Sequence, residues 1–419
     1  MTLAITNGTI IDGRGNDPLT GMTILIEDAR ITALGRSNSV TIPHGTQVID
    51  ARGGSILPGL IDTHVHFTME YPDVLRGLLT PPSLRLFQAI PRMRATLEAG
   101  VTTVRDAAGA PAGLKMAVER GIVAGPRMQV AITLISQTGG HGDGFYPCCV
   151  DIGFFGGSFT DVPRGVADGV DEVRKAVREV LRAGADWIKL ATTGGVLSTS
   201  DAPTSSQLTI EEIATAVYEA AAQEKRCMAH AQGTQGIKNA LLAGVVSIEH
   251  GVYLTDELIE LMLERDAFLV PTLIAPISVV EFSKGHPDLL PPMMAEKAVS
   301  VIERHKQSFR MAVEAGVKIA MGTDAGNIGT LHGPSVFREM ALMQQAGLTP
   351  LEVLRSATVY GAKAARHEND VGIIDTGRFA DMVLLDADPL IDVTNLSRVY
   401  QVIKGGSVFD PDELIRSIR

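Results

Sequence analysis

Pro58-Gly59-Leu60-Ile61-Asp62-Thr63-His64-Val65-His66 is the stretch that decides the fold of this 419-residue chain. It begins with an apolar run typical of a buried strand and ends in two histidines separated by one residue. Residues i and i+2 of a strand face the same side, so the two imidazoles can converge on one cation. The stretch therefore predicts a strand that carries half of a metal site.

Seven further apolar runs of strand length follow, and they alternate with segments of helical periodicity. The eight predicted strands are 60–66, 101–106, 128–134, 187–191, 227–231, 246–249, 267–272 and 318–322. Helical periodicity is clearest at 172–183, 210–222, 235–243 and 294–315. An open doubly wound sheet would need a Gly-rich phosphate loop after the first strand, and the sequence has none there. Eight strand-helix units instead predict a closed parallel (β/α)8 TIM barrel, an α/β fold, over 56–365.

Both ends of the chain predict strands of another kind. Residues 1–55 contain short apolar runs separated by Asn7-Gly8 and Asp12-Gly13, which are typical of hairpin turns. Runs of the same character return at 381–386 and 399–406. We therefore expect 1–55 and 366–419 to pair into one small β-sandwich domain beside the barrel.

Composition narrows the class of protein. The chain is 45% hydrophobic, enough for a sizeable core, and its net charge of -11 with no Lys/Arg-rich block argues against nucleic acid or an anionic membrane as a partner. No run of roughly 18 apolar residues predicts a membrane span, and the N-terminus lacks a secretory pattern. The three cysteines, Cys148, Cys149 and Cys227, form no C-x-x-C motif. We therefore expect the protein to be located in the reducing cytoplasm. Apolar residues in the loop 145–159 predict a homo-oligomer.

Residues able to bind metals recur where other predicted strands end. The carboxyl ends of barrel strands meet at one mouth, where the active sites of this fold lie. Lys189 lies in the fourth strand, His230 and His250 end the fifth and sixth, and Asp324 follows the eighth. Imidazoles with a carboxylate favour zinc or a neighbouring first-row metal. A protonated Lys189 would repel a cation, whereas its neutral amine can add carbon dioxide to give a carbamate whose two oxygens bridge two metals.

These motifs resemble those of the amidohydrolase superfamily over nearly the whole chain. The resemblance rests on 58–66, Lys189, His230, His250-Gly251, Gly322-Thr323-Asp324 and the return segment 377–385. It implies two divalent ions, zinc first, with His64, His66 and Asp324 on one ion and His230 and His250 on the other. Carboxylated Lys189 and a hydroxide would bridge them. The hydroxide would attack an amide carbonyl, and Asp324 would pass its proton to the leaving nitrogen.

A second set of residues bears on the substrate. His141 lies in the glycine-rich loop 138–144, where it either donates to the substrate carbonyl oxygen or sits exposed in a turn. Gly194-Gly195 either offers backbone N–H groups to a carboxylate or forms a simple turn. Further candidate contacts are Tyr146, Gln232 and His332. Related peptidases often have Tyr at the position of Gln232. The usual mode of binding a substrate carboxylate is therefore not expected to carry over unchanged to this chain.

The Gly-Gly-His-Gly-Asp loop together with Lys189 is similar to prolidase-type and Xaa-Arg/Lys-type enzymes. Those enzymes release the C-terminal amino acid of dipeptides or N-acyl amino acids. Asp143 and Asp201 are candidates for an acidic pocket, but no sequence feature fixes their orientation. The resemblance therefore implies a dipeptidase or carboxypeptidase with a neutral or hydrophobic leaving residue, proline first.

Three alternatives remain open. The first is opening of a cyclic amide, as in imidazolonepropionase-like relatives. The second is hydrolysis of an N-acyl aromatic amino acid such as a mycotoxin amide. The third, from another class, is a non-catalytic barrel that serves as a binding module, although relatives of that kind lose metal ligands and all six are present here.

Overall fold

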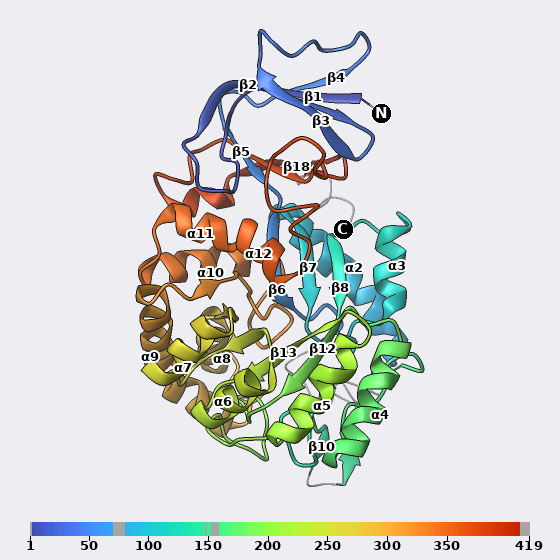
Figure 1. Cartoon of the computed structure of the whole chain (residues 1–419), viewed down its shortest axis with the longest axis vertical. Helices are drawn as coiled ribbons and strands as arrows, with labels where there is room; N and C mark the ends of the chain where they lie inside the picture. Colours follow the sequence, from blue (N-terminus) through green and yellow to red (C-terminus); the bar gives the residue numbers. More distant parts are fainter. Residues whose placement is uncertain (1, 70–79, 147–148, 152–158, 411–419) are drawn as a thin grey trace.

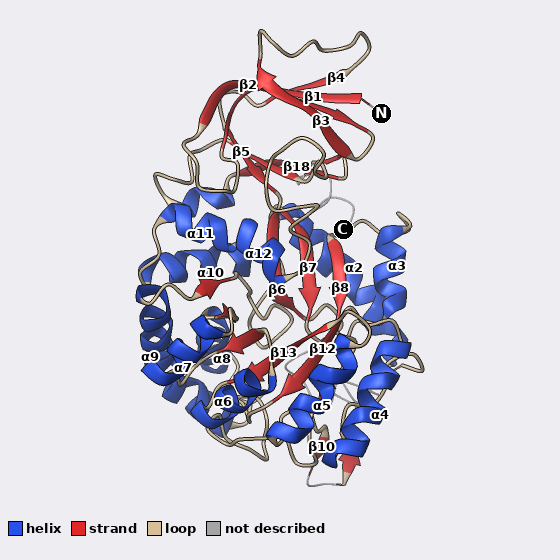
Figure 2. Ribbon diagram, in the orientation of Figure 1, coloured by secondary structure: helices blue, strands red, loops and turns tan. Residues whose placement is uncertain are grey.

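The computed structural model describes residues 2–69, 80–146, 149–151 and 159–410. A layer of strands lies at one end of the molecule, beside an α/β body (Figure 1). In that body the strands occupy the middle and the helices lie around them (Figure 2). Every helix within the described ranges is too short or too polar to cross a bilayer. Residues 147–148 and 152–158 of the loop expected to mediate self-association lie outside the described residues.

The two chain ends meet in one sheet. Its strands follow the order β19-β18-β17-β5-β1-β2-β3, and β4 pairs with β1. Their bounds are β1 Thr2–Ile10, β2 Leu19–Glu27, β3 Arg30–Arg36, β4 Gln47–Asp50, β5 Ser55–Pro58, β17 Met382–Leu385, β18 Val399–Lys404 and β19 Ser407–Phe409. The pairing of the two ends is confirmed, whereas the predicted sandwich is wrong, because the described strands form a single mixed sheet. β17 joins the halves by pairing antiparallel with β5 and with β18.

Parallel strands form the centre of the α/β body. β6 (Leu60–Val65), β7 (Val101–Asp106) and β8 (Arg127–Val130) make a three-stranded sheet in that order. A six-stranded sheet has the order β16-β15-β14-β13-β12-β9. Its strands are β9 Leu134–Ile135, β12 Trp187–Ala191, β13 Arg226–Ala231, β14 Ser247–His250, β15 Phe268–Val270 and β16 Lys318–Ile319. These strands confirm the predicted α/β class, and each of the eight predicted strand segments overlaps at least one of them.

The predicted closure of the barrel is wrong for the described residues. The predicted third strand is divided between β8 and β9, because Ile132 lies between them in the left-handed region with φ 67° and turns the chain. At the other join β16 is only two residues long. The segment after it contacts β6 through single hydrogen bonds, from Thr63 N to Met321 O (2.9 Å) and from Asp324 N to His64 O (2.8 Å). The second of these places Asp324 beside the first histidine.

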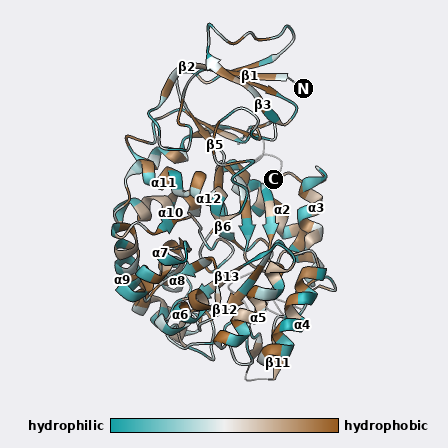
Figure 3. Ribbon diagram, in the orientation of Figure 1, coloured by the Kyte–Doolittle hydropathy of each residue, from teal (hydrophilic) through white to brown (hydrophobic). Residues whose placement is uncertain are grey.

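Amphipathic helices cover the strands. In α4 (Gly169–Arg182) the buried residues Val173, Ala176, Val177 and Val180 share one face, and polar residues occupy the other (Figure 3). The predicted helical segments correspond to α4, α5, α6 and α9, and Gly244 ends α6 with φ 97°. The bounds of these and of the remaining described helices are α2 Pro82–Glu98, α3 Ala112–Glu119, α5 Ile210–Ala221, α6 Thr234–Ala243, α7 Asp256–Glu264, α8 Ile274–Gly285, α9 Pro292–Glu314, α10 Pro334–Gln345, α11 Pro350–Ser356, α12 Val359–Ala364 and the 3-10 helix η1 Val393–Ser397. β10 (Phe145–Tyr146) pairs antiparallel with β11 (Val150–Asp151).

Candidate metal centre and active site

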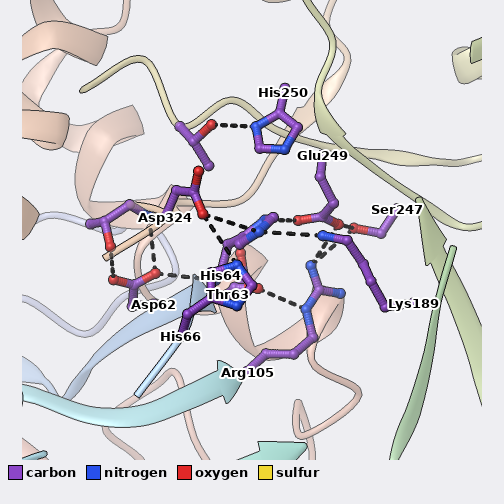
Figure 4. Close-up of polar contacts among 12 residues, drawn as sticks. Asp62, Thr63, His64, His66, Arg105, Lys189, Ser247, Glu249, His250 and Asp324 are labelled. Atoms are coloured by element: carbon purple, nitrogen blue, oxygen red, sulfur yellow. Dashed lines mark hydrogen bonds and ion pairs between the residues drawn. The ribbon is translucent and has the colours of Figure 1, made fainter. Parts of the chain in front are cut away.

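Two histidines and a carboxylate converge at the end of β6. The ligand atoms of His64, His66 and Asp324 all lie within 4.8 Å of one another, and the three residues are buried. Oδ1 of Asp324 is 3.2 Å from Nε2 of His66 and 3.6 Å from Nε2 of His64 (Figure 4). These converging atoms need a positive charge between them, which a proton or a divalent ion supplies.

The outer nitrogens of both histidines are held by acceptors. Nδ1 of His64 donates to Oε2 of Glu249 at 2.6 Å, and Nδ1 of His66 donates to the carbonyl oxygen of Ala108 at 3.0 Å. A carbonyl oxygen only accepts, so Nδ1 of His66 carries the proton. Protonation at Nδ1 leaves Nε2 free to bind a cation, which is the usual arrangement around histidine ligands. The residues therefore fit a metal ion.

His230 and His250 form a neighbouring pair. Their ring centroids are 4.6 Å apart, and that of His250 is 5.2 Å from that of His64. Nε2 of His230 donates to the carbonyl oxygen of Gly194 (3.0 Å), which leaves Nδ1 with its lone pair. Nδ1 of His250 is 2.7 Å from the hydroxyl of Thr272. Both histidines line the same cavity as the first cluster, so the structure brings together the residues predicted for two ions.

Lys189 reaches the cluster from β12. Its Nζ lies 3.3 Å from Nε2 of His64, and the side chain is buried. Burial lowers the pKa of Lys189 to about 8, although the charges of Glu249 and Asp324 oppose the shift. A buried amine with this pKa loses its proton far more readily than a surface lysine. The environment therefore suits the neutral amine that carbamate formation requires.

Burial also sets the charge of the other ligands. It lowers the pKa of His64, His230 and His250 well below the ordinary range, and neighbouring charged or imidazole groups lower it further. For Asp324, burial raises the pKa, but the contacts of its carboxylate with His66, His64 and Asn327 outweigh this effect and bring the pKa to about 2. These three histidines are therefore neutral and Asp324 is ionised near neutral pH, as metal ligands must be.

A buried network beneath His64 escaped the sequence analysis. Nη2 of Arg105 donates to Oε1 of Glu249 at 2.9 Å, and its Nε donates to the carbonyl oxygen of Thr63 at 2.7 Å (Figure 4). The hydroxyl of Ser247 donates to the same Glu249 oxygen at 2.6 Å. Arg105 and Glu249 are fully buried. The sequence did carry a signal for this ion pair, namely a charged residue inside each of two apolar strands, Arg105 in β7 and Glu249 in β14. Charged residues are rarely buried without a partner.

Asp62 also escaped the sequence analysis. Its carboxylate accepts hydrogen bonds from the backbone N–H of His64 (3.1 Å) and from the N–H and hydroxyl of Thr323 (3.1 and 2.7 Å). It therefore ties the end of β6 to the segment that carries Asp324. Burial raises the pKa of Asp62 to about 7, against the effect of these hydrogen bonds.

His141 lies at the cavity beside the second histidine pair. Its ring stacks on that of His230 with centroids 4.0 Å apart. A side chain on Gly195 would place its Cβ 2.3 Å from Cε1 of His141, so the ring packs directly on that glycine. The backbone N–H of His141 donates to Oε1 of Gln207 at 2.9 Å. The predicted His141 and Gly195 are thus direct neighbours, and the carbonyl oxygen of Gly194 contacts the ring of His230.

The cavity wall away from the ligands is largely apolar. Gln232 lines it, whereas His332 does not and instead stacks on Phe67 with ring centroids 4.8 Å apart. Tyr146 lies in β10, but its side chain is outside the described residues. The apolar lining comprises Met69, Ala107, Ala108, Leu134, Phe145, Val196, Leu197, Val252, Ala275, Pro276, Val279 and Val301.

The two acidic residues considered for a basic substrate are already engaged. Asp143 accepts from the backbone N–H groups of Gly139 (2.8 Å) and Phe145 (3.1 Å). Asp201 accepts from the N–H of Gly195 (3.0 Å) and from Nε2 of Gln207 (2.8 Å). Both carboxylates therefore stabilise loops, which disfavours a pocket for an Arg or Lys side chain.

Comparison with known proteins agrees with this geometry. The model of the amidohydrolase family matches residues 55–409. Ochratoxinase from Aspergillus niger is 33% identical, and the match covers 96% of this chain and 85% of that protein.

Solved structures match over almost the whole chain. That of a Xaa-Pro dipeptidase with bound methionine is 34% identical, with a TM-score of 0.90 and coverage of 98% of this chain and 100% of the other. A prolidase complexed with N-methylphosphonate-L-proline is 33% identical, with a TM-score of 0.87 and the same coverage.

Proposed function

Because the chain belongs to the amidohydrolase family and is a metal-dependent amidohydrolase, we propose that it hydrolyses dipeptides or N-acyl amino acids. The released product is the C-terminal amino acid, and Xaa-Pro substrates are favoured. The observation that carries the proposal is one cavity that combines a cation site at His64, His66 and Asp324 with an apolar wall. Because Asp143 and Asp201 are engaged in loops, the leaving amino acid is neutral or hydrophobic.

Two divalent ions, zinc first, fit the ligands present. One ion would be held by His64, His66 and Asp324 and the other by His230 and His250, and Lys189, once carboxylated, would supply a further ligand to both. Carbamate formation joins the neutral amine to carbon dioxide and releases one proton. When bound, the ions supply Lewis-acid activation of water and of the amide carbonyl.

The protein side chains then move protons and place the substrate. Asp324 is ionised and buried, and its Oδ2 accepts from Nδ2 of Asn327 at 2.8 Å, which fixes the carboxylate. It is therefore suited to take a proton from water and to deliver it to the leaving nitrogen. His141 lines the cavity beside His230, which supports its role as donor to the substrate carbonyl oxygen.

A second candidate substrate is an N-acyl aromatic amino acid. The wall formed by Val196, Val252, Val279 and Val301 can bury an aromatic side chain, which gains more from burial than proline does. The similarity to ochratoxinase, which extends over 96% of this chain, supports the same class. The other two alternatives, opening of a cyclic amide and a non-catalytic binding role, are distinguished by the substrate screen that follows.

The test is a screen of zinc-loaded protein against four sets of compounds: Xaa-Pro dipeptides, N-acyl aromatic amino acids, dipeptides ending in Arg or Lys, and ring amides. We expect turnover of the first set, weaker turnover of the second and little of the third, with Asp324→Asn as the inactive control. Activity on ring amides alone would overturn the substrate assignment. Absence of bound metal and of any turnover would favour the binding role.

A further inference from the structure

One face of α9 contacts the loops around the cavity. Lys297, Val301, His305 and Ser308 recur at helical spacing on this face. Ser308 donates from its hydroxyl to the carbonyl oxygen of Val252 (2.7 Å), and Nε2 of His305 donates to that of His250 (2.9 Å). Val301 lines the cavity between these residues and Lys297. The helix thus holds the backbone that follows β14.

Lys297, at the start of this face, holds a second loop. Its Nζ donates to the carbonyl oxygens of Ser198 (2.8 Å), Gly195 (3.3 Å) and Asp201. The loop between Gly195 and Asp201 comprises residues 196–200, and all five of these residues line the cavity. One ammonium group therefore fastens both ends and the middle of a loop that faces the substrate.

These contacts use all three donors of the ammonium group. The carboxylate of Asp201 is not its hydrogen-bond partner, because that group accepts from Gly195 N, Ser198 Oγ and Gln207 Nε2. Lys297 is therefore committed to the backbone and has no donor left for a substrate carboxylate. Hydrogen bonds from a charged donor are roughly twice as strong as neutral ones, so the loop depends strongly on this residue.

The same loop supports His141. Gly195, which Lys297 contacts, packs against the His141 ring, and Gln207, which binds Asp201, also accepts from the His141 backbone. We propose that Lys297 is a positioning residue that fastens the loop Gly195–Asp201 over the cavity, and so sets the affinity for the apolar part of the substrate. The kinetic part of this inference rests on the proposed function.

The test compares Lys297→Met with Lys306→Met. Lys306 lies on the same helix but only pairs with exposed Glu303 at 3.1 Å, so it controls for loss of a charge on α9. Hydrogen exchange of the 195–201 amides needs no substrate, and we expect it to accelerate about 10-fold or more in Lys297→Met alone. We expect KM to rise about 5- to 10-fold with kcat changed less than about 3-fold, at unchanged zinc content.

Lys297→Gln keeps a neutral amide group with two N–H donors, so its exchange rate and KM are expected to lie between those of wild type and Lys297→Met. This variant keeps the test open if the methionine variant folds poorly. The inference would be overturned if the 195–201 amides of a folded Lys297→Met protein exchanged hydrogen at the wild-type rate. It would also be overturned if Lys306→Met accelerated this exchange and raised KM as much as Lys297→Met does. If the loop opens as expected but no amide is turned over by the wild type, the proposed function fails while the role of Lys297 stands.

Discussion

Oε2 of Glu249 lies 2.6 Å from Nδ1 of His64, and this contact keeps Nε2 of His64 directed toward Asp324. The same carboxylate balances the buried charge of Arg105. One side chain from β14 therefore orients a metal ligand on β6 and stabilises the interior between the two sheets.

Glu249→Gln is expected to weaken zinc binding by about 10- to 100-fold, because partners of histidine ligands contribute about that much to metal affinity. It should also destabilise the metal-free protein by about 3 kcal/mol or more, since Arg105 loses its buried counter-charge. Chelator competition and urea unfolding measure the two effects. Glu257→Gln, at an exposed pair with Lys238, is the matched control. Unchanged zinc affinity would show that Glu249 does not orient His64.

Asp324→Asn is expected to keep much of the bound metal but to lower kcat by about 100-fold or more, because the amide cannot take up a proton at neutral pH. Metal analysis and kinetics on the same preparation separate the two properties. Full activity in this variant would remove Asp324 from the proton-transfer role.

Gly195→Ala is expected to lower kcat/KM by about 100-fold, because its Cβ would lie 2.3 Å from Cε1 of His141 and displace that ring. Gly195 does not have a positive φ, so the backbone itself accepts alanine. Gly113→Ala is the control, since a Cβ there meets nothing within 4 Å. Turnover equal to that of the control would support the interpretation of His141 as part of a simple turn.

Lys189→Ala is expected to lower turnover by more than about 100-fold, because the proposed ions would lose a bridging ligand. If Lys189 acts as a carbamate, propionate can fill the gap with a carboxylate and restore part of the activity. Ethylamine is the opposite control, since it would rescue a role played by the amine. Rescue by ethylamine alone would contradict carboxylation.

Glu339 predicts a pH dependence of stability in the chelator-treated protein. Burial raises its pKa from 4.5 to about 8, although its oxygens accept from the backbone N–H groups of Leu273 and Ile274. The folded state therefore binds this proton more tightly than the unfolded state. Its stabilising contribution is present below about pH 4.5 and is lost as pH rises through about 8.

The free energy of unfolding of wild type, relative to Glu339→Gln, should accordingly fall between pH 5 and pH 8. Urea unfolding at several pH values measures this difference, in which the other titrating groups cancel. A difference that is constant with pH would contradict the raised pKa.

Local patterns in the sequence determined the family, the α/β class and the residues that gather at the cavity. The spacing of His64 and His66 on a strand, and the recurrence of ligand-type residues at other strand ends, are properties of short segments. They fix which residues face one side of a strand, and parallel strands bring those sides together. The bounds 1–55, 56–365 and 366–419 remain predictions, as do the catalytic roles of individual residues.

The tertiary structure alone decided how these segments join. A left-handed residue at Ile132 divides a predicted strand, and pairing of β17 with both β5 and β18 makes one sheet where two were expected. Contacts over long sequence separation also place Glu249 beside His64 and stack the ring of His332 on that of Phe67. Hydrogen bonds to nearby backbone groups engage the carboxylates of Asp143 and Asp201 within their own loops. Hydropathy periodicity reports which side of a segment is buried, but the partner that a buried polar group meets depends on packing between distant parts of the chain.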